Sequence, residues 1–270
     1  MKQLIFLGTG MAMATECYNT CFLLRLSEHS YFLTDAGGGN GILKRMKEAG
    51  ADFADLHHMF VTHGHTDHIV GCIWVVRKIA AMMTKGEYEG EFHIYAHDVA
   101  CNIIETMVRM MLKKSEIACL GKRIFLHEVT DGQTVHFLDV TLTAFDICST
   151  KAKQFGYELR FDDSSLRLTC LGDEPFNEHD RVYAEGADWL LSEAFCRYAD
   201  RDVFQPYEKK HSTVKEAAEL AEKLHAKNLI LYHTEDKHLG ERKETYTREA
   251  ENYYKGRIFV PDDLDVIDLE

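Results

Sequence analysis

The stretch THGHTDH, residues 62–68, crowds metal-ligating side chains into one turn: His63, His65, Asp67 and His68. Imidazoles at positions i and i+2 at the end of a strand can converge on one cation, because the backbone is leaving extended geometry there. Asp67 and His68 follow just after the turn and can serve a second ion. We therefore predict a metal site here, in preference to a polar loop of unrelated histidines.

The flanking sequence supports this prediction. Residues 58–62 (HMFVT) read as a strand that runs directly into the motif, and an apolar helix is expected from residue 69 to about residue 84. A motif held between two buried elements is positioned by them. His57 and His58, just upstream, lack such a pattern, and we expect them to face solvent.

The wider chain predicts an α/β domain. Short apolar runs broken by glycine turns indicate a β-rich start, and the last hundred residues alternate strand and helix without a linker rich in Pro, Gly or Ser. We expect one domain over residues 1–270, with helices outside two sheets. The expected elements include one strand over 134–146, strands at 156–161, 165–171, 188–192 and 228–232, and helices at 41–49, 98–113, 213–225 (capped by Ser212) and 241–254.

Composition limits the possible partners. The net charge of −13, from 44 acidic and 31 basic residues, gives no general attraction to a polyanion. Eight cysteines without a C-x-x-C pair indicate reduced thiols. The start MKQLIFLGTG has too few apolar residues for the apolar region of a signal peptide. No apolar run reaches the roughly 18 residues expected of a membrane-spanning helix. We expect a cytoplasmic protein with no membrane association.

A group of methionines lies in the helix expected at 98–113. Met107, Met110 and Met111 favour core packing or an oligomer interface over a metal site, because methionine fills apolar surfaces more often than it binds ions.

The motif THGHTDH resembles the signature of the metallo-β-lactamase superfamily. The segments LGTG (Leu7 to Gly10), NTCFLL, DAGGG, GDE and EAF make the chain similar to its ribonuclease Z-like branch. The resemblance implies an αββα four-layer sandwich and two divalent metal ions. Zinc is expected, with manganese or iron as alternatives.

The resemblance also implies a role for each matching residue. His63 and His65 bind the first ion, Asp67, His68 and His233 bind the second, and Asp173 of LGDE bridges the two. Asp67 also acts in catalysis by orienting the attacking water. Glu193 of SEAF and His211 of KKHST resemble the pair that protonates the leaving group, and Asp35 resembles a buried acid that supports the metal-binding turn.

The first departure from the family pattern concerns Cys148. The family places a third histidine for the first ion shortly before an F-G-Y strand, and the segment FDICSTKAKQFGY has Cys148 at that place. A thiolate is a good zinc ligand but lowers the Lewis acidity of the ion relative to imidazole. We predict Cys148 as a ligand of the first ion; the alternative is a weakened first site.

The second departure is a deletion. Ribonuclease Z enzymes commonly carry a long arm that grips tRNA between the F-G-Y strand and the GD motif. Here only ELRFDDSSLRLTCL separates Tyr157 from Gly172. The arm is absent, which makes a small or RNA-derived phosphodiester a better expected substrate than precursor tRNA.

We therefore expect a metal-dependent phosphodiesterase, acting as a homodimer. Two alternatives remain open at this point: a hydrolase of another ester class, or a catalytically weak metal-binding or thiol-sensing protein in which Cys148 has replaced a ligand histidine.

Overall fold

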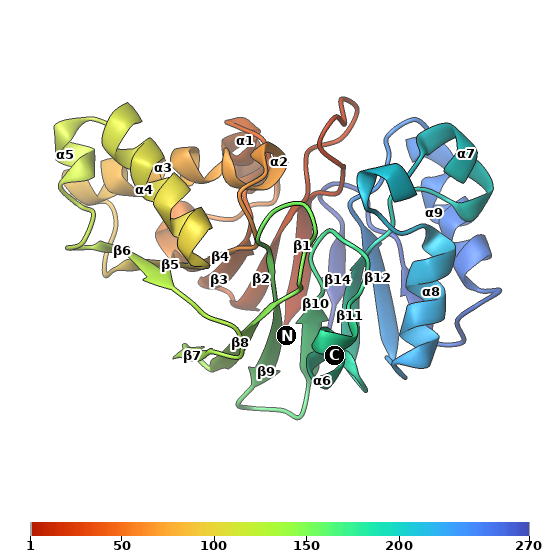
Figure 1. The fold of residues 1–270 in the computed structure, drawn as a ribbon. Coiled ribbons are helices and arrows are strands. Elements are labelled where there is room, and N and C mark those ends of the chain that lie inside the picture. Colours follow the sequence, from red (N-terminus) through yellow and green to blue (C-terminus); the bar gives the residue numbers. More distant parts are fainter. Residues whose placement is uncertain (1, 270) are drawn as a thin grey trace. The chain divides into compact units, whose positions relative to one another are not determined.

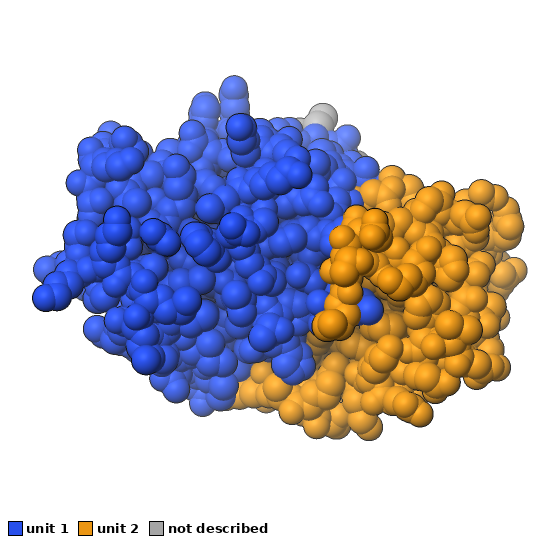
Figure 2. Space-filling view, turned by 90° about the horizontal axis from the view of Figure 1, so that it is seen from above, with its two compact units in different colours: residues 1–12, 17–129, 263–270 blue, residues 13–16, 130–262 orange. Residues whose placement is uncertain are grey.

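The computed structural model describes residues 2–269, and the chain divides into two compact units. Unit 1 comprises residues 1–12, 17–129 and 263–270, and unit 2 comprises residues 13–16 and 130–262 (Figure 2). Each unit contains one seven-stranded mixed sheet. The expectation of a single domain over residues 1–270 stays a prediction.

The sheet of unit 1 has the strand order β14-β1-β2-β3-β4-β5-β6. Strands β14, β1, β2 and β3 pair antiparallel, and β3, β4, β5 and β6 pair parallel. The strands are β1 (Gln3–Gly8), β2 (Cys21–Ser27), β3 (Ser30–Thr34), β4 (Leu56–Val61), β5 (Phe92–Ala96), β6 (Ile124–Glu128) and β14 (Val266–Asp268).

Helices of unit 1 cover one face of this sheet (Figure 1). They bury an apolar stripe each, and Ile42, Val76 and Ile104 are fully enclosed between helix and sheet. The helices are α1 (Gly41–Glu48), α2 (Thr66–Ile69), α3 (Cys72–Lys85), α4 (Asp98–Met111) and α5 (Lys114–Ile117), with a short 3-10 helix at Phe53–Asp55.

The sheet of unit 2 repeats this plan, in the order β13-β12-β11-β10-β9-β8-β7. Strands β7 to β10 pair antiparallel, and β10 to β13 pair parallel. The strands are β7 (Thr134–Phe137), β8 (Val140–Asp146), β9 (Phe155–Phe161), β10 (Arg167–Cys170), β11 (Trp189–Glu193), β12 (Asn228–Tyr232) and β13 (Arg257–Phe259).

Helices α8 and α9 pack on one face of the second sheet through small residues such as Ala217, Ala221 and Ala250 (Figure 1). The helices of unit 2 are α6 (Arg181–Ala184), α7 (Arg201–Phe204), α8 (Val214–Lys223) and α9 (Leu239–Ala250), with 3-10 helices at Glu178–Asp180, Tyr198–Asp200 and Tyr207–Lys209.

The parallel strands position the site residues. Parallel neighbours end at the same edge of a sheet, and the loops that follow them gather there. In unit 1 this edge carries Asp35 after β3 and His63 after β4. In unit 2 it carries Asp173 after β10, Glu193 at the end of β11 and His233 after β12.

The structure corrects three expectations. Residues 134–146 form a hairpin of β7 and β8, turning at Leu138, which has a positive φ of 50°. Helix α8 is capped by Thr213, not Ser212, because Thr213 makes a capping box with Glu216. Met110 and Met111 are 81% and 66% exposed, so the core interpretation is wrong for both, and an oligomer interface stays a prediction.

None of the helices in residues 2–269 combines the length and the apolar character that crossing a bilayer requires.

Close approach of two backbones requires glycine at residue 71. The Gly71 amide donates to the carbonyl of Gly37 at 2.8 Å, and a Cβ at residue 71 would lie 1.9 Å from the carbonyl oxygen of Ala36. We expect Gly71→Ala to push α3 away from the loop that follows β3, at a cost of about 1–3 kcal/mol. Thermal unfolding should show a melting temperature lower by several degrees.

Gly39→Ala is the matched control, because a Cβ there would meet no atom within 4 Å. Equal melting temperatures for the two variants would contradict this account of Gly71.

Candidate metal centre

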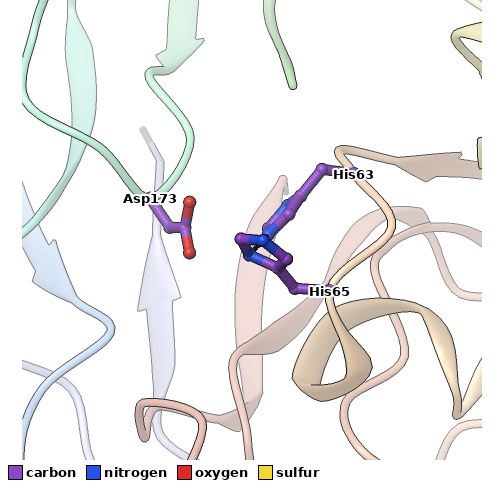
Figure 3. Close-up of side chains that lie close together, drawn as sticks. All are labelled: His63, His65 and Asp173. Atoms are coloured by element: carbon purple, nitrogen blue, oxygen red, sulfur yellow. Dashed lines mark hydrogen bonds between the residues drawn. The ribbon is translucent and has the colours of Figure 1, made fainter. Parts of the chain in front are cut away.

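The turn after β4 brings two imidazoles together. Nε2 of His63 and Nδ1 of His65 lie 2.9 Å apart, and the rings meet edge to face with centroids 4.5 Å apart (Figure 3). The backbone of His65 is extended at φ −70° and ψ 149° before α2 begins. The i, i+2 spacing therefore turns both side chains to one place, as the sequence predicts.

A buried carboxylate holds this turn from behind. Asp35 Oδ1 accepts the Thr62 amide at 2.8 Å, and Oδ2 accepts the Thr62 hydroxyl at 2.7 Å. Because that hydroxyl donates to Asp35, it can only accept from Nδ1 of His63, which lies 2.9 Å away. The proton of His63 is thereby placed on Nδ1, and Nε2 presents a lone pair for a cation.

The same carboxylate orients the last histidine of the motif. Asp35 Oδ2 accepts from Nδ1 of His68 at 2.7 Å, so Nε2 is the nitrogen with which His68 would bind a cation. That Nε2 lies 3.4 Å from Oδ2 of Asp67. The α2 turn places these two donors on consecutive residues, and both side chains are buried.

A second set of ligands gathers in unit 2. Ligand atoms of Asp173, His211 and His233 lie within 4.8 Å of one another, and all three residues are buried. Nε2 of His233 is 3.6 Å from Oδ2 of Asp173. The side chain of Asp173 is drawn in Figure 3. Gln154 donates its side-chain amide to Oδ1 of Asp173, which orients the carboxylate.

Glu193 and His211 face each other beside this set. Oε2 of Glu193 lies 3.5 Å from Nδ1 of His211, and within residues 2–269 neither atom has a hydrogen-bond partner. The amide of Ser212 donates to Oε1 of Glu193, which ties the carboxylate to the residue after the histidine. His211 also stacks on Phe195, with centroids 4.9 Å apart, so the ring is fixed on several sides.

Burial controls the titration of this pair in the metal-free protein. Burial raises the pKa of Glu193 to about 8, against the opposing effect of the Ser212 amide. Burial and the ammonium of Lys151 lower the pKa of His211 to about 4. Between these values Glu193 carries the proton and His211 is neutral.

Cys148 lies on the loop between β8 and β9. It is exposed and has a positive φ of 56°, and its Sγ is 3.7 Å from the backbone carbonyl of Asp146. Burial and the charge of Asp146 raise the pKa of its thiol. Within the described part of unit 2 it does not join the Asp173, His211 and His233 group, so its role as a ligand of the first ion stays a prediction.

Three supporting residues escape the sequence analysis: Thr62, Gln154 and Glu174. Thr62 sets the tautomer of His63, and Gln154 and Glu174 connect the β8–β9 loop to the turn at Asp173. Each is adjacent to a recognised motif, THGHTDH, FGY or GDE. A position next to a motif suggests a supporting role, but the sequence does not show which neighbouring side chain points toward the site.

The donor sets fit a divalent transition ion. Imidazole and carboxylate groups suit zinc, manganese and iron. In His63 and His68 the Nδ1 atom is engaged by Thr62 and Asp35, respectively, which leaves Nε2 to present a lone pair. The residues His63, His65, Asp67 and His68 come together within unit 1, and Asp173, Glu193, His211 and His233 come together within unit 2.

Comparison with known proteins identifies the family. Residues 2–252 match the family model described as "Anti-Pycsar protein Apyc1". The chain belongs to this family. The ribonuclease Z of Bacillus cereus strain AH187 is 36% identical over 313 residues, covering 96% of this chain and 97% of the relative. That span exceeds the 270 residues of this chain, so the relative carries segments that have no counterpart here.

Solved structures agree on the fold. The metallo-β-lactamase fold protein YhfI from Bacillus subtilis has a TM-score of 0.78 at 18% identity, and covers 98% of both chains. The short form of human tRNase Z has a TM-score of 0.77 at 20% identity, and covers 99% of both chains. The ribonuclease Z-like recognition and the αββα fold class of the metallo-β-lactamase type are therefore confirmed.

The pair of Glu193 and His211 predicts a dependence of stability on pH. The pKa of Glu193 is 4.5 unfolded and about 8 folded, so its contribution is complete below pH 4.5 and is lost as pH rises through 8. Folded His211 is neutral above pH 6.5, and in the unfolded state it titrates alike in wild type and variant, so it cancels from the comparison. We expect metal-free Glu193→Gln to gain in melting temperature over the wild type between pH 6.5 and 8.

The control is Glu251→Gln, an exposed position. A difference between wild type and Glu193→Gln that stays constant across this range would show that Glu193 is already ionised in the folded protein.

Proposed function

We propose that the protein is a phosphodiesterase that binds two divalent ions, with a small phosphodiester as substrate. The observation that carries the proposal is the prepared turn after β4, where Asp35 and Thr62 orient His63 and His68 for ligation. A solvent-facing histidine loop has no need of such buried support. Membership of the Apyc1 family and the ribonuclease Z relatives support a reaction on phosphodiester bonds.

The proposed ligand sets follow the resemblance to the ribonuclease Z-like branch. His63, His65 and Cys148 would bind the first ion, Asp67, His68 and His233 the second, and Asp173 both. When bound, such ions lower the pKa of coordinated water to about 7 and offset the charge of the phosphate. Zinc is the expected metal.

The residues of the chain perform the remaining steps. Asp67 accepts a hydrogen bond from the attacking water and fixes its direction. His211 donates the proton on its Nε2 atom to the departing oxygen, and its Nδ1 atom takes up the proton carried by Glu193, whose Oε2 lies 3.5 Å away. Burial of both side chains keeps competing water away from this transfer.

The size of the substrate follows from the β9–β10 hairpin. Strand β9 ends at Phe161 and β10 begins at Arg167, and the two pair directly, so this connection has no room for a tRNA-binding arm. The net charge of −13 does not replace the lost contacts. We extend to this chain, within the same proposal, the anti-Pycsar role that the family description names.

We further propose a homodimer in the cytoplasm. The exposed Met110 and Met111 on α4 provide apolar surface for such contact.

A comparison of substrates tests the proposal. The metal-loaded protein should hydrolyse a chromogenic phosphodiester and should process precursor tRNA poorly, because remote contacts that would position a large RNA are missing. Rates on both substrates, measured as kcat/KM at one salt concentration, decide the matter. Higher kcat/KM on precursor tRNA would overturn the choice of a small substrate, and no hydrolysis of either would favour the metal-binding or thiol-sensing alternative.

The acid role of His211 predicts a dependence on the leaving group. We expect His211→Ala to lower kcat about 10²- to 10⁴-fold for an alkoxide leaving group and much less for nitrophenolate, which needs little protonation. Metal content should stay unchanged. His136→Ala is the control, because that histidine lies on β7 with its side chain 57% exposed.

Equal losses for both leaving groups would contradict the acid role of His211. Loss of metal from the variant would instead place His211 among the ligands, as its grouping with Asp173 and His233 allows.

The ligand role of Cys148 predicts protection by metal. A coordinated thiolate resists iodoacetamide, and after chelation it should be alkylated, because the free thiolate is the nucleophile. Labelling of Cys148 with and without metal, read by mass spectrometry with Cys148→Ser as the blank, measures this. Cys148→His should keep the fold and restore or raise activity.

If metal does not change the labelling rate and Cys148→His has unchanged activity, Cys148 is not a ligand of the site.

A further inference from the structure

The loop between β8 and β9, residues 147–154, is fixed to the turn that carries Asp173. Glu174 follows Asp173 directly and is only 6% exposed. Its Oε1 accepts the Ser149 hydroxyl at 2.5 Å, and its Oε2 accepts the Thr150 amide at 3.2 Å. Ser149 Oγ in turn accepts the amide of Lys151 at 3.2 Å. The backbone on which Lys151 stands is therefore well defined.

The ammonium of Lys151 lies beside the carboxylate of Glu174, but its hydrogen-bond donors are not saturated. Within residues 2–269 its ion pair is with Oε1 of Glu174 at 3.8 Å, too long for a hydrogen bond, and that oxygen already serves Ser149. The side chain is only 24% exposed. Three N–H donors on a partly buried cation thus remain available to a ligand.

The position of this cation follows from its partner. Because Glu174 is the residue directly after Asp173, an ammonium 3.8 Å from Oε1 of Glu174 lies beside the turn that carries Asp173. In a chain of net charge −13, a cation held at this turn favours an anionic ligand there.

We propose that Lys151 binds an anionic oxygen of the substrate phosphate, and that Glu174 positions it for this contact through the β8–β9 loop. This inference rests on the proposed phosphodiesterase function and names the residue that recognises the phosphate. A phosphodiester presents one negative charge to the ammonium, and a charge-assisted hydrogen bond of this kind is among the stronger polar contacts.

Kinetics of the metal-loaded protein test the proposal. Lys151→Gln should raise KM for a chromogenic phosphodiester at least about ten-fold, with kcat changed less than about two-fold, because the contact is made to the bound substrate. The inhibition constant of inorganic phosphate should rise in parallel. Lys151→Arg should retain most of the affinity, since it keeps the charge.

Lys153→Gln is the matched control. Lys153 lies two residues further along the same loop, where its ammonium lies over the ring of Phe155 at 5.5 Å. The Lys153→Gln substitution removes the same charge without removing the proposed contact, and the KM of this variant should stay at the wild-type value. An equal rise of KM in both variants would overturn the assignment, because it would reflect general charge and not a contact of Lys151.

Two failures can be told apart. If the wild type hydrolyses the diester but Lys151→Gln leaves KM and phosphate inhibition unchanged, the inference is wrong and the proposed function stands. If the wild type hydrolyses no phosphodiester, the proposed function is wrong. Calorimetric titration with inorganic phosphate then decides about Lys151 alone: weaker binding by Lys151→Gln than by Lys153→Gln supports it, and equal binding overturns it.

Discussion

The carboxylate of Asp35 is the interaction on which the metal-binding turn depends. It is 2% exposed and accepts three hydrogen bonds, two from Thr62 and one from His68. A buried carboxylate is costly unless its oxygens are satisfied, so these bonds are retained as a set. Through them one side chain fixes the path of residues 62–68 and the ligating nitrogen of two histidines.

The backbone around the site is held in conformations that non-glycine residues avoid. Asp35, Cys148 and His233 have φ values between 55° and 57°, and Lys210, just before His211, has a φ of 58°. Left-handed conformations cost of order 1 kcal/mol or more each and persist where surrounding structure imposes them. Strand ends, hydrogen bonds and burial impose these left-handed conformations here. They give the side chains directions that an ordinary turn would not give.

Much of this arrangement could be predicted from the sequence, because strong patterns carry it. An apolar strand leading into THGHTDH gives both the position and the chemistry of the turn, and β11 and β12, read as WLLSE and NLILY, end at Glu193 and next to His233. Parallel strands then bring these side chains to one edge of their sheet. Short motifs at the ends of buried strands are the most predictable part of the site.

The remainder depends on contacts that one sequence does not display. The hairpin turn at Leu138 interrupts an apolar run without Gly or Pro, so 134–146 reads as one strand. Met110 and Met111 follow helical spacing, but that spacing does not reveal which side of α4 is covered. The inward direction of Gln154 and Glu174 arises from the folding of the β8–β9 loop onto the turn at Asp173.

We propose that these prepared side chains hold two ions per chain. Elemental analysis of protein reconstituted with excess zinc and then desalted measures this directly. We expect about two zinc ions per chain, as in a dinuclear hydrolase site. A stoichiometry well below one ion per chain would contradict it.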